Sequence, residues 1–301
     1  MAIKLPKFSP GTLLYIYELK IKEGQDRFAD LDLLALLGDS FAGYHLEIDF
    51  AFVFCLARVD LKPLFAALPG TVLKEEHILR YDQWQDGVGS KPIVIGPLCI
   101  LPAGNSHSLT TCDSVSGAAS LLGFPKRLAP IYIDPALAFG YGGHATTKAC
   151  LSFLVRIMGP QNTFIPETFL DLGCGTGVLS IAAVALGGKS ALGVDYSHLA
   201  AQCALANREL NQMEDKISFV HGLAADYAKY KADVLLANIP LFVHLELLEK
   251  GAYLSRSYLI LSGLLPKEAD ELKGKLSKTI DFVEVDNHRD DRWSSCLLKV
   301  K

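Results

Sequence analysis

Hydrophobic residues in the second half of the chain follow two alternating patterns. Short apolar runs that are typical of buried strands lie at 168–172, 191–195, 217–221, 233–237 and 258–261. Stretches with apolar residues at helical spacing lie between them, at 178–186, 198–211, 241–250 and 266–276. Two last runs, 282–285 and 295–300, are joined by a short loop and predict an antiparallel pair. This alternation predicts an α/β fold with a parallel sheet that helices cover on both faces.

The first 86 residues have a different order of elements. The pattern predicts, in turn, a strand at 13–21, a helix at 28–37, half-buried strand segments at 44–50 and 53–56, a helix from Asp60 to Pro69-Gly70 and a strand at 71–80. This order is that of a ferredoxin-like α+β domain. No Asn-Gly or similar turn dipeptide lies near Asp49, so one long bent strand over 44–56 is an open alternative.

Loop-like composition divides the chain into three parts. Glycine and polar residues fill the stretch 86–92, and Gly, Ser and Thr occur throughout 102–130. We therefore expect a smaller N-terminal domain over residues 1–86, a connecting segment over 87–130 and an α/β domain over 131–301.

Charge and hydropathy exclude several classes of function. The chain has 29 Lys and Arg residues and 33 Asp and Glu residues, so its net charge is −4. This charge argues against electrostatic binding of nucleic acid, and it is compatible with a basic protein partner. The longest apolar run, 50–57, is far below the ~20 residues that cross a bilayer, and the first residues lack an apolar stretch of secretory-signal length. We expect a cytoplasmic protein without membrane contact. No Cys-x-x-Cys pair occurs, so no metal site is expected.

A glycine-rich loop follows the first predicted strand of the α/β part. It reads Asp171-Leu172-Gly173-Cys174-Gly175-Thr176-Gly177, and it lies where a strand turns into a helix, so that a cofactor can approach the backbone and the helix N-terminus. Asp195 ends the next strand, 22 residues after Gly173, where an acidic side chain can bind both hydroxyls of an adenosine ribose. Sites for dinucleotides and for S-adenosylmethionine share this pairing.

Asp171 distinguishes the two cofactors. Its carboxylate at ~4 Å would repel a pyrophosphate by about 4 kcal/mol at an effective dielectric of ~20, whereas it would attract the ammonium group of S-adenosylmethionine. The loop also reads Gly-x-Gly-x-Gly and not Gly-x-Gly-x-x-Gly, since position 178 is Val. We therefore predict an S-adenosylmethionine site that includes Asp171, Gly173, Gly175 and Asp195. A tight turn without a ligand is the alternative.

Further segments carry a resemblance to a known family. They read Ile133-Asp134-Pro135-Ala136-Leu137-Ala138-Phe139-Gly140-Tyr141-Gly142-Gly143-His144-Ala145-Thr146-Thr147, Ala237-Asn238-Ile239 and Leu261-Ser262-Gly263-Leu264-Leu265. Together with the glycine loop and Pro92-Ile93-Val94-Ile95-Gly96, they closely resemble the PrmA family of ribosomal protein L-eleven methyltransferases, from about residue 84 to the C-terminus. The resemblance implies a Rossmann-like class I methyltransferase domain that uses S-adenosyl-L-methionine, and a small N-terminal domain that recognises the ribosomal protein.

The resemblance also implies roles for single residues. Cofactor contacts would be Thr147, Gly173, Asp195 and Asn238, and Phe139 and Gly140 would border the methionine moiety. Asn238 ends the fourth strand, at the edge where open parallel sheets bind ligands, and we assign it the catalytic role of orienting the incoming amine. A turn-forming Asn before Pro240 is the plainer alternative. For His144, a loop role and a direct part in catalysis both stay open.

The reaction implied is methyl transfer to amine groups, of Lys side chains or an N-terminal α-amine, on a large-subunit ribosomal protein. It needs positioning and a neutral amine, and an α-amine of pKa about 7.7 loses its proton more readily than Lys at about 10.4. We expect a monomer without nucleic-acid contact.

Two alternatives stay open. One is methylation of an adenine amine in nucleic acid, suggested by Asn238-Ile239-Pro240-Leu241, and the other is a non-catalytic relative that binds a ribosomal protein. The first lacks an aromatic residue at position 241 to stack a base, and it lacks the basic charge. The intact acidic and glycine positions of the cofactor loop argue against the second.

Overall fold

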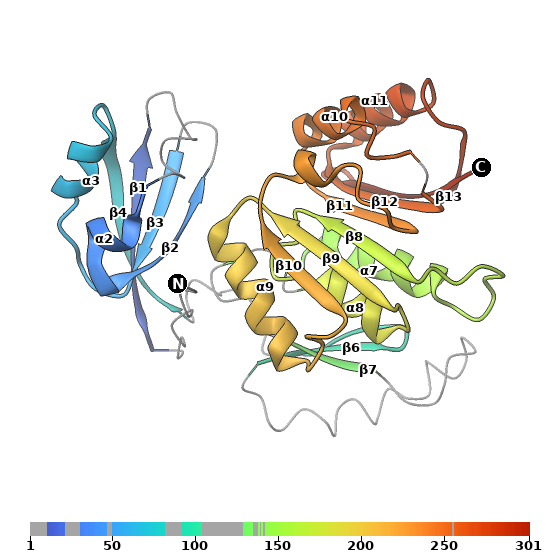
Figure 1. The fold of residues 1–301 in the computed structure, drawn as a ribbon, viewed down its shortest axis with the longest axis horizontal. Helices are drawn as coiled ribbons and strands as arrows, with labels where there is room; N and C mark the ends of the chain where they lie inside the picture. Colours follow the sequence, from blue (N-terminus) through green and yellow to red (C-terminus); the bar gives the residue numbers. More distant parts are fainter. Residues whose placement is uncertain are drawn as a thin grey trace.

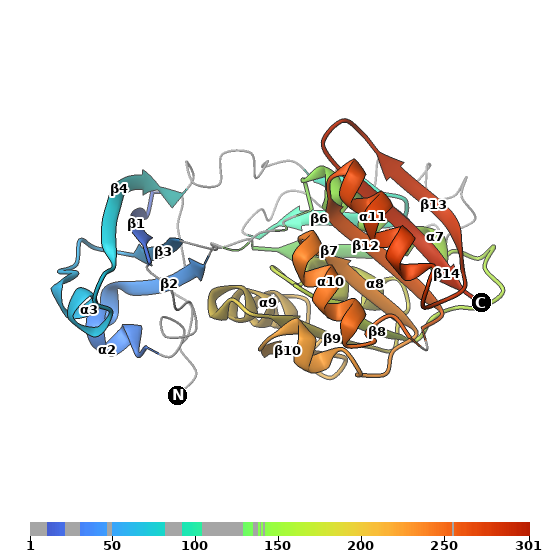
Figure 2. The ribbon, with the colours of Figure 1, turned by 90° about the horizontal axis from the view of Figure 1, so that it is seen from above.

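The computed structural model of the 301-residue chain describes residues 11–21, 31–46, 50–81, 92–103, 129–134, 138, 140, 142–254 and 256–301. Their strands form three sheets, of four, seven and three strands (Figure 1). The four-stranded sheet comes first in the chain and lies to one side of the other two in both views (Figures 1 and 2).

Seven strands form the largest sheet. They are β8 (Thr168–Leu172), β9 (Ser190–Asp195), β10 (Ile217–His221), β11 (Val234–Asn238), β12 (Tyr258–Leu264), β13 (Phe282–Arg289) and β14 (Ser294–Val300). Their spatial order is β10-β9-β8-β11-β12-β14-β13. The first five strands of this order are parallel, and β14 runs antiparallel to both β12 and β13. The predicted parallel α/β sheet and its antiparallel ending are confirmed.

Helices cover both faces of this sheet (Figure 2). One face carries α7 (Ala145–Ile157), α8 (Val178–Ala185) and α9 (His198–Leu210), and the other carries α10 (Leu241–Glu249) and α11 (Pro266–Leu276). Successive strand residues alternate between the two cores, as Phe169 packs with the first group of helices and Leu170 with the second. Within the described part of the chain, no helix combines the length and the apolar composition needed to cross a membrane.

A small three-stranded sheet packs against α7, α8 and α9. It contains β5 (Ile93–Ile95), β6 (Leu98–Pro102) and β7 (Ala129–Ile133), with β5 antiparallel and β7 parallel to β6. Side chains of β6 and β7 join the core on that face of the large sheet, among them Leu98 and Ile131, which are fully buried.

The sequence pattern predicts neither these three strands nor helix α7. Strands β6 and β7 pair across a long stretch of chain, so local residues do not specify them. Helix α7 does carry a pattern, because its exposed polar residues Lys148, Ser152 and Arg156 recur every four positions, and sequence reasoning missed this signal. Strands β5 and β6 fall in the segment that we expect to connect two domains, much of which, including 104–128, lies outside the described residues. The division at residues 86 and 130 stays a prediction.

The N-terminal sheet is antiparallel throughout, in the order β2-β3-β1-β4. Its elements are β1 (Leu13–Lys20), α2 (Leu33–Leu37), the 3-10 helix η1 (Gly38–Ser40), β2 (Phe41–Leu46), β3 (Phe50–Cys55), α3 (Lys62–Ala67) and β4 (Val72–Arg80). Because β2 and β3 are two antiparallel strands, the alternative of one bent strand is wrong. The strand order agrees with the ferredoxin-like class, which stays a prediction for this region. Residues 28–30 of the first predicted helix lie outside the described residues.

The N-terminal sheet contacts the first turn of α9. Leu199 packs in one apolar cluster with Leu14 and Phe54 of the sheet. Strand β2 comes very close here, because a Cβ on Gly43 would lie 2.6 Å from Cδ1 of Leu199. The sheet therefore meets the α/β part of the chain beside the end of β9.

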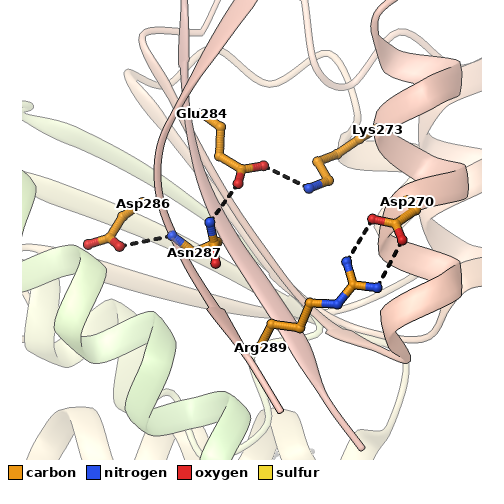
Figure 3. Close-up of polar contacts among 6 residues, drawn as sticks. All are labelled: Asp270, Lys273, Glu284, Asp286, Asn287 and Arg289. Atoms are coloured by element: carbon orange, nitrogen blue, oxygen red, sulfur yellow. Dashed lines mark hydrogen bonds and ion pairs between the residues drawn. The ribbon is translucent and has the colours of Figure 1, made fainter. Parts of the chain in front are cut away.

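Strand β13 is an edge strand that carries charged side chains (Figure 3). Arg289 pairs with both carboxylate oxygens of Asp270, at 2.8 and 2.9 Å, and Nζ of Lys273 donates to Oε2 of Glu284 at 2.7 Å. Both pairs join β13 to α11. Charged edge strands are poor templates for pairing with another chain, so we interpret these residues as protection of the open edge.

Candidate functional site

Polar residues gather at the carboxyl ends of the parallel strands. Asp195 is the last residue of β9, Asn238 is the last residue of β11, and Asp171 is the next-to-last residue of β8, which lies between those two strands. The direction in which strands are added to the sheet reverses at β8. Open parallel sheets bind ligands at such a switch point. The structure thus brings three of the predicted site residues to one edge.

The glycine loop needs its glycines for conformation and for space. Gly173, Gly175 and Gly177 have left-handed backbones, with φ of 76°, 55° and 79°. A Cβ on Gly173 would also collide with Cγ2 of Ile239, which follows β11. Because side chains are excluded, the loop backbone can lie close to the ends of β8, β9 and β11.

The loop also fixes the side chain of Asp195. Its Oδ2 accepts a hydrogen bond from the N–H of Gly175 at 2.8 Å, and its Oδ1 accepts one from the N–H of Ser197 at 2.9 Å. These two bonds orient the carboxylate group. This geometry is compatible with the predicted contact to ribose hydroxyls.

Asp171 is buried with only one of its oxygens bonded. Oδ2 accepts hydrogen bonds from the N–H of Ser180 at 3.2 Å and from its Oγ at 2.7 Å, whereas Oδ1 has no partner among the described residues. Burial raises the pKa of Asp171 to about 7; the bonds from Ser180 oppose this rise, and the charge of Asp195 adds to it. A buried acceptor without a partner is costly, so Oδ1 of Asp171 is a position at which a further donor would be stabilising.

Thr147 offers a second buried oxygen of this kind. It lies in the first turn of α7, and its Oγ1 has no hydrogen-bond partner in the part of the chain that the structure describes. The segment before α7 lies against the glycine loop, because Oγ1 of Thr176 donates to the carbonyl of Gly140 at 2.7 Å. Phe139 lies outside the described residues, so its contact with the cofactor stays a prediction.

Asn238 is bonded to the start of α7. Its Nδ2 donates to Oγ1 of Thr146 at 3.2 Å, and this oxygen lies 2.8 Å from Nδ1 of His144, the N-cap of the helix. Burial lowers the pKa of His144. The sequence did not single out Thr146, and its only signal was its place in the segment that resembles the family.

Two asparagines, Asn207 in α9 and Asn211 at its C-cap, bond to the chain that leads into this segment. The fully buried Asn207 bonds to both the N–H and the carbonyl of Asp134, and it donates to the carbonyl of Thr176 in the glycine loop. One turn later, Asn211 bonds to the N–H and the carbonyl of Tyr132. Sequence reasoning missed both residues, although two amides four positions apart in a largely apolar helix were the available signal.

One group of possible metal ligands occurs among the described residues, on the N-terminal sheet. Glu18, Glu75 and His77 each place a ligand atom within 4.8 Å of the others. They lie on the paired strands β1 and β4 and are partly exposed. Acidic groups on exposed neighbouring strands commonly lie this close without an ion, so we assign the group no ligand.

Comparison with known proteins gives a family for the larger part of the chain. The family model described as "Ribosomal protein L11 methyltransferase (PrmA)" matches residues 121–301. A ribosomal protein L11 methyltransferase of a Shewanella species is 38% identical over 175 residues, which are 57% of this chain and 56% of that protein. One of Thermoanaerobacter pseudethanolicus is 35% identical over 174 residues, 57% of this chain and 54% of that protein. The chain thus spans little more than half the length of these curated relatives.

A solved structure supports the same assignment. The crystal structure of a ribosomal protein L11 methylase from Lactobacillus delbrueckii subsp. bulgaricus has a TM-score of 0.54 and 26% sequence identity, and it covers 69% of this chain and 98% of that chain. The expected Rossmann-like class I methyltransferase fold is confirmed. Since the family model matches well over half of its residues, this chain belongs to the PrmA family.

Proposed function

We propose that this chain transfers methyl groups from S-adenosyl-L-methionine to amine groups of a large-subunit ribosomal protein, and the names of its relatives point to L11 as the substrate. The observation that carries the proposal is a pair of buried oxygens, Oδ1 of Asp171 and Oγ1 of Thr147, that lack a partner among the described residues. Buried polar atoms are normally bonded, so these two indicate a polar ligand at the carboxyl edge of the sheet.

The donors and acceptors at this edge fit S-adenosyl-L-methionine better than a dinucleotide. Oδ1 of Asp171 offers a negative oxygen to the ammonium group, and the carboxylate of Asp195 offers acceptors to the ribose hydroxyls. The first turn of α7, with Thr147, presents the positive end of a helix to the cofactor carboxylate. A pyrophosphate would instead meet two acidic side chains at one edge.

The chain's own part in the reaction is positioning. Bound S-adenosyl-L-methionine would supply an electrophilic methyl group on its sulfonium sulfur. Transfer to a neutral amine requires that the amine approach in line, and an amide side chain can orient it without removing a proton. We assign this role to Asn238, whose Oδ1 would accept a hydrogen bond from the amine and aim its lone pair at the methyl group.

We assign substrate recognition to residues 1–86. The N-terminal sheet packs on Leu199, four residues after Asp195, so a protein bound to this sheet would lie near the carboxyl edge. A shortened chain that begins at Gly89 should still bind the cofactor but should methylate the intact ribosomal protein poorly. Full activity of the shortened chain would remove this assignment.

Methyl-labelled S-adenosyl-L-methionine tests the proposal. The full chain is incubated with the purified ribosomal protein and, separately, with total RNA. Label on Lys or on the α-amine of the protein, located by mass spectrometry, supports the proposal. Label in RNA would support adenine methylation instead, and cofactor binding without any transfer would support the non-catalytic relative. The cytoplasmic location and the monomeric state stay predictions.

A further inference from the structure

A chain of hydrogen bonds runs from the end of β11 to the N-terminus of α7. Nδ2 of Asn238 donates to Oγ1 of Thr146 at 3.2 Å, and this oxygen lies 2.8 Å from Nδ1 of His144. The backbone N–H of Thr146 also donates to Nδ1 of His144, at 3.4 Å. The chain therefore links residues that are 92 positions apart in the sequence.

The direction of each bond in this chain follows from its donors. The amide nitrogen of Asn238 can only donate, so the hydroxyl of Thr146 accepts from it and is left with one hydrogen to give. Nδ1 of His144 already accepts from the backbone of Thr146, so it takes this hydrogen as an acceptor. The imidazole is then neutral, with its hydrogen on Nε2. Its burial, which disfavours the charged ring, agrees with this state.

The His144 end of the chain agrees with this rotation of the Asn238 amide. Because the hydroxyl of Thr146 gives its one hydrogen to Nδ1 of His144, it can only accept from Asn238, and Nδ2 is the side of the amide that donates. With Nδ2 turned to Thr146, the carbonyl oxygen Oδ1 points away from it, and none of the described residues donates to that oxygen. We propose that His144 and Thr146 are a positioning pair that holds Asn238 with Oδ1 toward the substrate amine. A rotated amide would present hydrogens to the amine lone pair, which must stay free to attack. The inference rests on the proposed function, because it takes the role of Asn238 from it.

His144, one member of this pair, also contacts the antiparallel end of the large sheet. The ring of Trp293 meets the ring of His144 edge-on, with centroids 5.3 Å apart and an angle of 74° between the planes. Trp293 lies in the connection between β13 and β14, where its backbone N–H donates to Oδ1 of Asp290 at 2.7 Å. The imidazole is thus held between the start of α7 and this connection, so that Nδ1 stays directed at Thr146.

Two neighbouring threonines make the inference testable. Thr146 and Thr147 are both buried in the first turn of α7, but the hydroxyl of Thr146 is bonded to Asn238 and that of Thr147 has no partner among the described residues. The same substitution at the two positions should therefore affect different steps. Thr146→Val should impair the transfer of the methyl group, and Thr147→Val should impair the binding of the cofactor.

The experiment measures kcat on the purified ribosomal protein and Kd for S-adenosyl-L-methionine by calorimetry, in full-length variants. Thr146→Val should lower kcat about 10- to 100-fold through misplacement of the amine, with Kd within about twofold of the unmodified chain. Thr146→Ser keeps the hydroxyl and should restore most of kcat. Thr147→Val should raise Kd and recover its rate at saturating cofactor.

A double variant separates a positioning role from a general structural role. If Thr146 acts only through Asn238, adding Thr146→Val to Asn238→Ala should cause no further loss of kcat. Losses that multiply, an unchanged kcat in Thr146→Val, or an equal loss in Thr146→Ser would each overturn the inference while leaving the proposed function in place. An unmodified chain that binds the cofactor and methylates nothing would overturn both.

Discussion

Aspartates at the two ends of the strands in the seven-stranded sheet differ in how their carboxylates are hydrogen-bonded. At the edge where the strands begin, Oδ2 of Asp233 accepts hydrogen bonds from the N–H of Glu167 at 2.9 Å and from the N–H and Oγ1 of Thr168 at 2.9 and 3.0 Å. At the edge where the strands end, Asp171 is bonded to Ser180 through one oxygen and to no described residue through the other. Asp171 lies near the end of β8 and Asp233 directly precedes the start of the adjacent parallel strand β11, so the two residues lie at opposite ends of neighbouring strands.

The pKa values of the two carboxyl groups separate because the two residues differ in burial as well as in bonding. Burial alone would raise the pKa of Asp233, but its hydrogen bonds from Glu167 and Thr168 lower it overall. Asp171 is almost completely buried whereas Asp233 is partly exposed, so burial raises the pKa of Asp171 to about 7 despite the opposing bonds from Ser180, and the charge of Asp195 adds to the rise. Among the described residues, buried acceptors without a partner lie on Asp171 and Thr147, at the edge where we propose the cofactor.

The largest expected effect is at the carboxyl edge. Asp195→Ala should weaken the binding of S-adenosyl-L-methionine about a hundredfold or more, because two charge-assisted hydrogen bonds of ~1.5–3 kcal/mol each are lost. Calorimetry measures the change, and thermal unfolding checks that the variant is folded. Asp233→Ala, at the opposite edge, is the matched control and should bind the cofactor normally. Normal binding by Asp195→Ala would remove the end of β9 from the site.

Asn238→Ala should lower kcat about 100-fold at saturating cofactor, because the amine loses the group that orients it. Some loss of cofactor affinity is expected as well, since Asn238 lies at the same edge as Asp171 and Asp195. Steady-state kinetics over a range of cofactor concentrations separates the two effects. A rate that recovers fully at saturation would show that Asn238 serves cofactor binding alone.

The pH dependence of stability should report Asp171 in the protein without cofactor. Between its ordinary pKa of 3.8 and its folded value of about 7, Asp171 keeps a proton in the native state that it loses in the unfolded chain. Its contribution to the free energy of unfolding is therefore full below the ordinary pKa and is lost as the pH rises through about 7.

Asp171→Asn should flatten this part of the profile. Urea unfolding of both proteins at about pH 5 and about pH 8 measures the difference, and the other titrating groups cancel because they are common to both. A difference in stability that is the same at the two pH values would contradict the assignment. In the unmodified chain, the cofactor should bind more tightly above pH 7, since its ammonium pairs with the ionised carboxylate.

The smallest effect is expected at Asp233, at the edge where the strands begin, and it concerns stability alone. Asp233→Ala should lower the free energy of unfolding by about 1–2 kcal/mol, because the N–H groups of Glu167 and Thr168 lose their acceptor. Since the folded pKa is lowered, the stabilising contribution of Asp233 is present above its ordinary pKa and is lost as the pH falls through the folded value. Denaturant unfolding measures both. A weakened cofactor affinity in this variant would break the distinction between the two edges.

Local hydrophobic patterns were sufficient to predict the elements of the large sheet. The strands expected at 168–172 and 217–221 and the helix expected at 266–276 coincide with β8, β10 and α11, and the other strands and helices differ by a few residues at their ends. Each of these elements has its own apolar period, so neighbouring residues alone specify it. Neighbouring residues do not specify strand β7, because it pairs with the distant strand β6 and packs against α8.

The sequence by itself determined which polar residues end the strands, since Asp171, Asp195 and Asn238 each interrupt or end an apolar run. Only the tertiary structure decided which of their atoms are bonded. The pairing of Asn238 with Thr146 and the unfilled oxygen of Asp171 depend on where α7 and α8 pack against the sheet. A hydrogen bond requires its two atoms to lie within about 3.5 Å and in line, and such positions are set by packing between distant segments, which no local pattern records.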